Sequence, residues 1–226
     1  MAAAQRSLDQ ETGDDRETQK REETAAGVVG AWLQTVAPDL EQEIAAIDQA
    51  LTNLGFDLQD GDPIAQDPAA DARLESLFAL IEELLHHPGK QKNKQAGDPW
   101  KDDERLVLFT EYKTTLDYLL RRLRERYKED RILTLFGGMV EDEQDQVKRA
   151  FNDRAHSARI LLATDAAAEG LNLQRTARYL LHFDCPWNPS RLEQRNGRLD
   201  RHGQARDVTV HHFVSDQDQD LQFLAQ

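Results

Sequence analysis

The stretch ARILLATDAAAEGLNLQ, residues 158–174, places a short continuous apolar run directly before a segment of small and polar residues. A continuous apolar run of this length is typical of a strand buried on both faces of a parallel sheet. Thr164 and Asp165 stand at the predicted strand end, where their side chains can cap a helical turn. Gly170 permits a close backbone approach to a ligand. Composition alone favours an ordinary capped turn here.

The same rhythm extends over the chain after Glu104. Further strand candidates are RLVLF (105–109), RILTL (131–135), ARYLLHF (177–183) and DVTVHHFV (207–214). Helical patterns lie between them at Lys113–Tyr127, Glu143–Phe151 and Ser190–Arg201. Strands that alternate with helices indicate βαβ units and a doubly wound parallel sheet of the α/β class. Ligands bind such sheets at the carboxyl ends of the strands.

The predicted strand ends gather small, polar or charged residues at that edge. The residues that follow the first, second and fourth strands are Thr110 to Tyr112, Gly137 with Gly138, and DCPWNP (184–189). Each junction alone is an ordinary turn or helix cap, whereas four of them on one edge favour a binding edge. His182 and Cys185 have metal-like spacing, but no second pair completes a site, so no metal site is expected.

The segment QRNGRLDRHGQ, 194–204, sets Arg195, Arg198 and Arg201 three residues apart within a predicted helix. This spacing places all three over one broad helix face. A solvated basic face is the plainer interpretation. The alternative is that these planar, always-charged forks reach a phosphate at the ligand edge. Spacing alone leaves both interpretations open.

Composition bounds the class of protein. The chain has 226 residues, is 39% hydrophobic and carries a formal net charge of −14, of which −12 falls on residues 1–100 (20 Asp and Glu against 8 Lys and Arg). Overall acidity therefore argues little against a nucleic-acid partner for the rest of the chain. A single cysteine, no export signal and no apolar run of about 20 residues predict a cytoplasmic protein with no membrane partner.

Residues 1–70 are expected to form an acidic helical segment, with helices over about Arg16–Leu33 and Asp39–Leu54. The run DARLESLFALIEELLHHPG, 71–89, predicts a helix whose apolar face comprises Leu74, Leu77, Phe78, Ile81 and Leu84. GKQKNKQAGDPWKDDE, 89–104, reads as a charged linker. Asp102 to Arg105 precede a strand, whereas a magnesium-binding acid should follow one, so we interpret these charges as part of that linker.

In order, these segments resemble the second RecA-like lobe of superfamily 2 helicases and translocases. LVLFTEYKTTLDYLLRRL (106–123) resembles motif IV, LLATDAAAEGLNLQ (161–174) motif V and QRNGRLDRHGQ motif VI. The phrase FDCPWNPSRLEQRNGRLDRHGQ (183–204) is similar to the Swi/Snf-type branch. Within that branch it is most similar to the bacterial group of the RNA-polymerase-associated recycling ATPase and phage-defence translocases. The resemblance covers 71–226 and implies a helicase C-terminal lobe that is incomplete at its C-terminal end, with the acidic segment as an inter-lobe brace or protrusion.

The resemblance implies roles for matching positions. Arg198 and Arg201 correspond to arginine fingers that meet the ATP γ-phosphate on the first lobe, and Gln194 helps organise that catalytic interface. Positions for nucleotide ribose and lobe coupling are Glu169, Gly170 and Asn172. Positions that touch the nucleic-acid backbone are Thr110, Gly137, Gly138 and Thr164. Asp165 is expected to be a local organiser rather than a catalytic base.

Two residues depart from the family's pattern. Phe136 stands where many members have His before the glycine turn, which argues against a polar contact from that side chain. Gly197 precedes Arg198, where eukaryotic Swi/Snf proteins usually have Asp. This glycine places the chain on the bacterial side and argues against a nucleosome substrate.

No GxxxxGK[ST] phosphate loop occurs in the sequence. The expected function is therefore the second ATPase lobe of a Swi/Snf-type ATP-dependent double-stranded DNA translocase, inactive as this fragment alone. ATP and Mg²⁺ would be held by the first RecA-like lobe of the same parent chain, with RNA polymerase or a phage-defence complex as a partner. Two alternatives stay open. One is a non-catalytic nucleic-acid-binding or protein-docking module with a degenerate RecA fold, against which intact Arg198 and Arg201 argue. The other is an RNA helicase lobe, which would not ordinarily carry the WNP phrase.

Overall fold

The computed structural model describes residues 15–53, 71–88, 98–168, 170–186 and 188–214. The chain divides into two compact units, one of Arg16–Ser76 and the other of Leu77–Gln226 together with Gly13–Asp15. The predicted loop after Leu54 and much of the predicted linker after Gly89 lie outside the described residues.

The first unit is helical. It contains α2 (Asp15–Val36) apart from its first residue, Asp15, the short 3₁₀ helix η1 (Ala37–Asp39) and α3 (Glu41–Asn53). Both predicted helices therefore form, and Pro38 lies in the turn between them. Trp32 and Ile47 are 52% and 58% exposed, so these helices leave large apolar side chains at the surface.

The second unit is a five-stranded parallel sheet. Its strands are β1 (Leu106–Thr110), β2 (Ile132–Leu135), β3 (Ile160–Thr164), β4 (Tyr179–His182) and β5 (Thr209–His212). They are ordered β2-β3-β1-β4-β5, and every neighbouring pair is parallel. The predicted α/β, doubly wound sheet is confirmed. β1 and β3 are buried at every position, as their continuous apolar runs predict.

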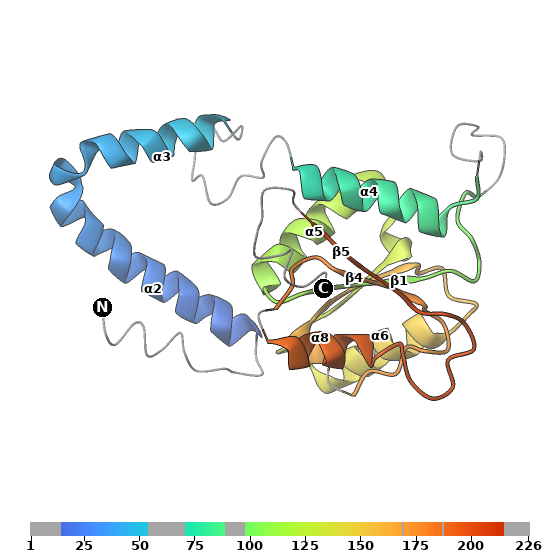
Figure 1. Ribbon diagram of the computed structural model, residues 1–226. Coiled ribbons are helices and arrows are strands. Elements are labelled where there is room, and N and C mark those ends of the chain that lie inside the picture. The colour runs from blue at the N-terminus through green and yellow to red at the C-terminus, as the bar shows by residue number, and fades with distance from the viewer. Residues whose placement is uncertain (1–14, 54–70, 89–97, 169, 187, 215–226) are drawn as a thin grey trace. The chain divides into compact units, whose positions relative to one another are not determined.

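Helices cover both faces of this sheet (Figure 1). α4 (Ala72–Leu85) and α5 (Lys113–Arg126) lie on one face, and α6 (Glu141–Asn152) and α8 (Pro189–Asn196) lie on the other. The order of the strands accounts for this arrangement. The connection from β1 to β2 runs across the sheet in the opposite direction to the later connections, and crossovers between parallel strands are right-handed. α5 and α6 must therefore lie on opposite faces.

The core follows the alternation of side chains along the strands. Val107, Leu161 and Leu180 point to the same face and pack with Phe151 of α6 and with Leu199, which follows α8. All five are at most 1% exposed. Burial of one such side chain is worth about 1.5–3 kcal/mol, so this cluster fixes the position of the chain that follows α8.

The buried face of α4 differs by one position from the prediction. Leu77, Phe78 and Ile81 are buried as expected, but Leu85 is fully buried in place of Leu84, which is only half-buried. Leu85 follows Ile81 by four residues and so continues the same helical stripe.

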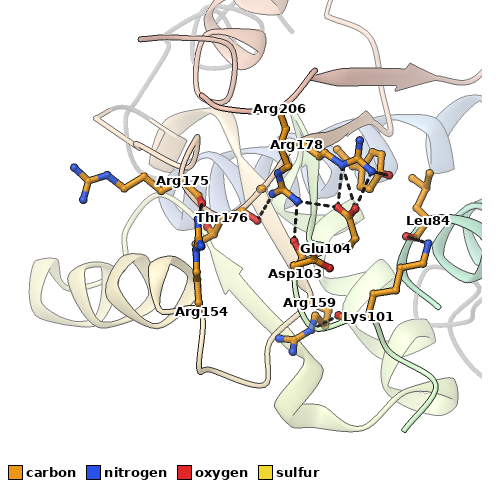
Figure 2. Close-up of polar contacts among 12 residues, drawn as sticks. Leu84, Lys101, Asp103, Glu104, Arg154, Arg159, Arg175, Thr176, Arg178 and Arg206 are labelled. Atoms are coloured by element: carbon orange, nitrogen blue, oxygen red, sulfur yellow. Dashed lines mark hydrogen bonds and ion pairs between the residues drawn. The ribbon is translucent and has the colours of Figure 1, made fainter. Parts of the chain in front are cut away.

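The amino-terminal edge of the sheet is lined by arginines that have protein partners (Figure 2). An arginine stands directly before each of the first four strands, at Arg105, Arg131, Arg159 and Arg178. Arg178 donates to Glu104 through Nη2 at 2.7 Å, and Arg206 donates to the other oxygen of the same carboxylate at 3.3 Å. Glu104 is only 8% exposed.

The interpretation of Glu104 and Arg105 as linker charges is therefore wrong. Arg105 is 1% exposed and donates from Nη2 to the carbonyl oxygens of Asp153 at 2.6 Å and His156 at 3.2 Å. Its Nη1 donates to the carbonyl of Phe151 in the last turn of α6, where backbone acceptors lack helical partners. Burial lowers the pKa of Arg105 to about 10, so the side chain remains charged at neutral pH.

Candidate functional site

The carboxyl edge of the sheet brings together several residues that the sequence singled out. Thr110 and Thr164 end neighbouring strands and are partners in the β1–β3 register. The backbone N–H of Gly137 donates to Thr164 Oγ1 at 3.3 Å, which places the turn after β2 beside the end of β3. Gly138 has φ +83°, a conformation that favours glycine.

The predicted helix over Ser190–Arg201 is shorter than expected. α8 begins at Pro189, where the Asn188 side chain accepts from the N–H of Ser190 at 3.0 Å, and it ends at Asn196. Gly197 follows, and tight turns then carry the chain to Leu199, whose side chain enters the core. The Leu173 N–H donates to the Arg198 carbonyl at 3.1 Å and holds the turn in place.

The three arginines of this segment therefore do not share one helix face, which corrects the prediction from their spacing. Arg195 lies in the last turn of α8, whereas Arg198 and Arg201 lie beyond the end of the helix. Glycine is a poor helix former, and the burial of Leu199 requires the chain to turn inward.

Arg195 is the centre of a buried ion-pair network and is only 2% exposed. Its Nε and Nη2 donate to the two carboxylate oxygens of Asp165 at 2.5 and 2.8 Å. It also donates to the carbonyl of Asp184 at 2.8 Å and to the Asp184 carboxylate at 3.3 Å. Burial alone would lower the pKa of Arg195, but hydrogen bonding and charge from Asp165 and Asp184 raise it overall. Arg195 thus holds the network together and has no donors left for a large ligand.

Asp184, which follows β4, extends this network to the end of β1. Its carboxylate accepts from Thr110 Oγ1 at 2.5 Å and from the N–H of Glu111 at 2.9 Å. Glu111 in turn pairs with Arg191 of α8 at 3.0 Å. The ends of β1, β3 and β4 and the helix α8 are therefore joined through buried or half-buried charges. Asp184 belongs to the predicted junction 184–189, but its individual role depends on contacts with distant residues that the local sequence does not specify.

His182, the last residue of β4, is buried and contacts other protein side chains. It is 3% exposed, and its Nε2 lies 3.0 Å from Asn196 Oδ1. Burial lowers the pKa of His182 to about 4, so the ring is neutral at physiological pH. Among the described residues, no group of three or more His, Cys, Asp or Glu is arranged to hold a metal ion.

Arg198 differs sharply from Arg195. Its side chain is half-buried, and its Nε is buried without a hydrogen-bond partner among the described residues. Arg201 is exposed, and its Nη1 donates to Asn172 Oδ1, which links the two sequence motifs that contain them. Gln194 is exposed on α8.

The remaining positions predicted to contact the nucleotide are Glu169 and Gly170, which follow β3 in the sequence. Gly170 has φ +75° and open space where a Cβ would lie, so its backbone conformation rather than crowding favours glycine. Glu169 lies outside the described residues.

None of the described helices is both long enough and apolar enough to cross a membrane.

The residues predicted to contact the nucleic-acid backbone have two different kinds of protein partner. Thr110 is fully buried, and its hydroxyl is committed to Asp184. Thr164 and the Gly137 N–H both donate, at 2.5 Å, to one carboxylate oxygen of Asp15, which belongs to the same compact unit. These two donors therefore converge on a single anionic oxygen.

Comparison with known proteins agrees with this geometry. The model of the helicase conserved C-terminal domain matches residues 91–203. The uncharacterized ATP-dependent helicase YqhH of Bacillus subtilis is 34% identical over 151 residues, which cover 66% of this chain and 26% of that protein. The RNA polymerase-associated protein RapA of Vibrio atlanticus is 37% identical over 111 residues, which cover 49% of this chain and 11% of that protein. The chain therefore spans about a quarter or less of the length of these relatives.

The fold has a solved counterpart in the C-terminal part of the Fun30 ATPase domain. That structure superposes with a TM-score of 0.51 at 19% identity, over 79% of this chain and 50% of the other. The likeness supports the RecA-like architecture of the sheet. Because the family model matches half of the sequence, the chain belongs to the helicase conserved C-terminal domain family.

Proposed function

We propose that this chain is the second ATPase lobe of a Swi/Snf-type, ATP-dependent translocase that moves on double-stranded DNA. Arg198 and Arg201 would meet the γ-phosphate of ATP held by a first RecA-like lobe of the same parent protein. The observation that carries the proposal is a difference within this segment: Arg195 and Arg201 donate to protein partners, whereas the Nε of Arg198 has no partner among the described residues.

The surroundings of Arg198 suit a finger that acts on a separate domain. Phosphoryl transfer requires mainly positioning and charge stabilisation, and an arginine supplied from another domain is worth about 10³–10⁵ in rate. The buried Arg195–Asp165 pair fixes the helix on one side of Arg198. The fully buried Leu199 fixes the chain on the other side. Arg198 can therefore reach the reacting phosphate only when the two lobes close.

ATP itself would be bound mostly elsewhere. The described residues offer an unsatisfied arginine donor for a phosphate but no cluster of acids for Mg²⁺. Gln194 would help organise the catalytic interface, and Glu169, Gly170 and Asn172 would lie near the ribose. The Arg201–Asn172 hydrogen bond supports a shared position for these two motifs.

The nucleic acid would bind at Thr164, Gly137 and Gly138. Thr110, whose hydroxyl donates to Asp184, would support this site indirectly. Contacts of hydroxyl and backbone N–H groups to phosphates carry no base identity, which suits a motor that must pass every sequence. The relatives named RNA polymerase-associated proteins make RNA polymerase the first partner to test, in a bacterial cytoplasm, with a phage-defence complex as the second.

The test is ATP hydrolysis by the full-length parent protein with duplex DNA, single-stranded DNA or RNA. Duplex DNA should stimulate turnover most. Arg198→Ala should lower kcat by about 10³ or more while ATP binding, measured with a fluorescent analogue, stays within error of wild type. The matched control is Arg175→Ala, which removes an exposed arginine from the opposite edge of the sheet and should leave kcat unchanged.

Full turnover in Arg198→Ala would refute the finger assignment. Stimulation by RNA but not by duplex DNA would instead favour an RNA helicase lobe. A parent protein that binds DNA but never hydrolyses ATP would favour the non-catalytic module.

A further inference from the structure

Lys113, the first residue of α5, extends over the carboxyl edge of the sheet. Its Nζ lies 4.5 Å from the centroid of the Phe136 ring. Lys113 follows β1 and Phe136 follows β2, and β3 lies between these two strands. The Lys113–Phe136 contact therefore joins the two strands that flank β3. Gly137 directly follows Phe136, and its N–H donates to Thr164 at the end of β3.

The Phe136 ring fixes the ammonium group without accepting a conventional hydrogen bond. An ammonium over an aromatic face is attracted by the ring's quadrupole. Lys113 also pairs with Asp117, one turn further along α5, at 2.6 Å. Because an ammonium has three N–H donors, one carboxylate does not use them all. The Lys113 side chain is only 13% exposed, so its position is set by packing rather than by solvent.

The neighbouring donors already bind an anionic oxygen. Thr164 Oγ1 and the Gly137 N–H converge at 2.5 Å on one carboxylate oxygen of Asp15. A phosphate oxygen is also an anionic acceptor and makes the same kind of charge-assisted bond. This edge therefore combines two convergent neutral donors with one fixed cation.

We propose that Lys113, held over the Phe136 ring, is an additional contact to the phosphate backbone of duplex DNA at the Gly137–Thr164 site. The inference rests on the proposed function, because it deepens the nucleic-acid site assigned there. It also gives Phe136 a purpose. The ring makes no polar contact with the nucleic acid but fixes the cation that does.

The test uses the 226-residue chain and a fluorescein-labelled, mixed-sequence DNA duplex of three helical turns, about 30 base pairs. Fluorescence anisotropy gives the binding constant at a series of NaCl concentrations without ATP. Lys113→Gln should weaken binding about tenfold, as for the loss of a charged hydrogen bond. It should also reduce the slope of log K against log salt by about 0.9, because one fewer phosphate is neutralised.

Three variants control this result. Lys148→Gln removes another lysine that pairs with an aspartate on its own helix, Asp145 at 3.6 Å, and it should change neither affinity nor slope. Phe136→Leu keeps the charge but removes the ring, so affinity should fall while the salt slope stays near that of wild type. Phe136→Tyr should bind like wild type. Circular dichroism establishes that each variant is folded.

The outcomes separate the two proposals. If the wild-type chain binds duplex and Lys113→Gln keeps both affinity and slope, the Lys113 contact is overturned while the nucleic-acid site stands. Equal losses in Lys113→Gln and Lys148→Gln would also overturn it, since they would indicate a general charge effect. If the wild-type chain does not bind duplex even at low salt, the nucleic-acid part of the proposed function is overturned with it.

Discussion

At the scale of single residues, the environment rather than the residue type assigns roles to the arginines of this domain. Arg195 and Arg198 are three positions apart, yet one is fully paired in the interior and the other has a buried Nε without a partner among the described residues. Removing one partner of a buried pair is strongly destabilising. Arg195 therefore contributes to the stability of the domain, whereas Arg198 is the residue to which the proposed function assigns a ligand.

His182 belongs to the same scale and predicts a pH dependence of stability. Its folded pKa of about 4 lies below the ordinary value of 6.5, so the folded state keeps the ring neutral. The stability associated with this neutral ring is fully present above pH 6.5 and is lost as the pH falls toward 4. Linkage gives a loss of about 2 kcal/mol between pH 7 and pH 5.

The measurement is urea unfolding of the 226-residue chain at both pH values, for wild type and His182→Gln. Because glutamine does not titrate, the variant should lose about 2 kcal/mol less than wild type over this interval. Other groups titrate in both proteins and cancel in the comparison. Equal losses in the two proteins would show that His182 does not carry the effect.

At the scale of secondary-structure elements, the two edges of the sheet use charge in opposite ways. Arginines at the amino-terminal edge are bonded to carbonyls and to Glu104, and they join the strands to the loops that precede them (Figure 2). The carboxyl edge also contains paired charges. Arg198, which lies beyond the end of α8, differs from them because its Nε has no partner among the described residues. The arginine contacts at the amino-terminal edge are therefore structural, whereas the proposed function places ligand binding at the carboxyl edge.

Glu104 and Asp102 give a matched test of this view. Glu104→Gln leaves Arg178 and Arg206 without their shared carboxylate and should lower the free energy of unfolding by roughly 1–3 kcal/mol. This figure is below that for a fully buried pair because the two arginine side chains are 28% and 31% exposed. Asp102 is fully exposed beside Arg159, so Asp102→Asn should leave stability unchanged. The check is urea unfolding followed by circular dichroism, and equal effects of the two substitutions would refute the assignment.

Much of the fold could be predicted because it depends on local patterns. The apolar runs before Thr110 and Thr164 identify buried strands, and their alternation with helices identifies the parallel sheet. The end of α8 was missed because the residues after Gly197 continue a helix-compatible pattern, whereas the burial of Leu199 turns the chain inward.

The candidate site could be predicted only in part. The carboxyl edge and its junctions follow from the order of the strands. The partners of Arg195 do not, because Asp165 and Asp184 lie 30 and 11 residues away in the sequence and meet it only in the folded domain. The same limit applies to Lys113 over Phe136, since local sequence patterns do not specify contacts between distant segments.

At the scale of the whole molecule, the proposed function makes this domain the second half of a two-lobe catalytic arrangement. The sequence contains no phosphate loop, and the described residues contain no candidate metal site. Under the proposed function, the 226-residue chain alone should show no ATP hydrolysis above buffer, with or without duplex DNA. A coupled phosphate-release assay, with the intact parent protein as positive control, measures this. Hydrolysis by the chain alone that disappears in Arg198→Ala would show a complete site within it.

The pinning of Arg198 between the Arg195 network and Leu199 has a mechanical consequence. The ion-paired Arg195 precedes this arginine and the buried Leu199 directly follows it, so its backbone is anchored on both sides. Under the proposed function, only travel of the entire domain as a rigid body closes the distance. The rate of hydrolysis would then depend on the separation between the two domains. Any partner that increases this separation would slow hydrolysis without contacting the nucleotide.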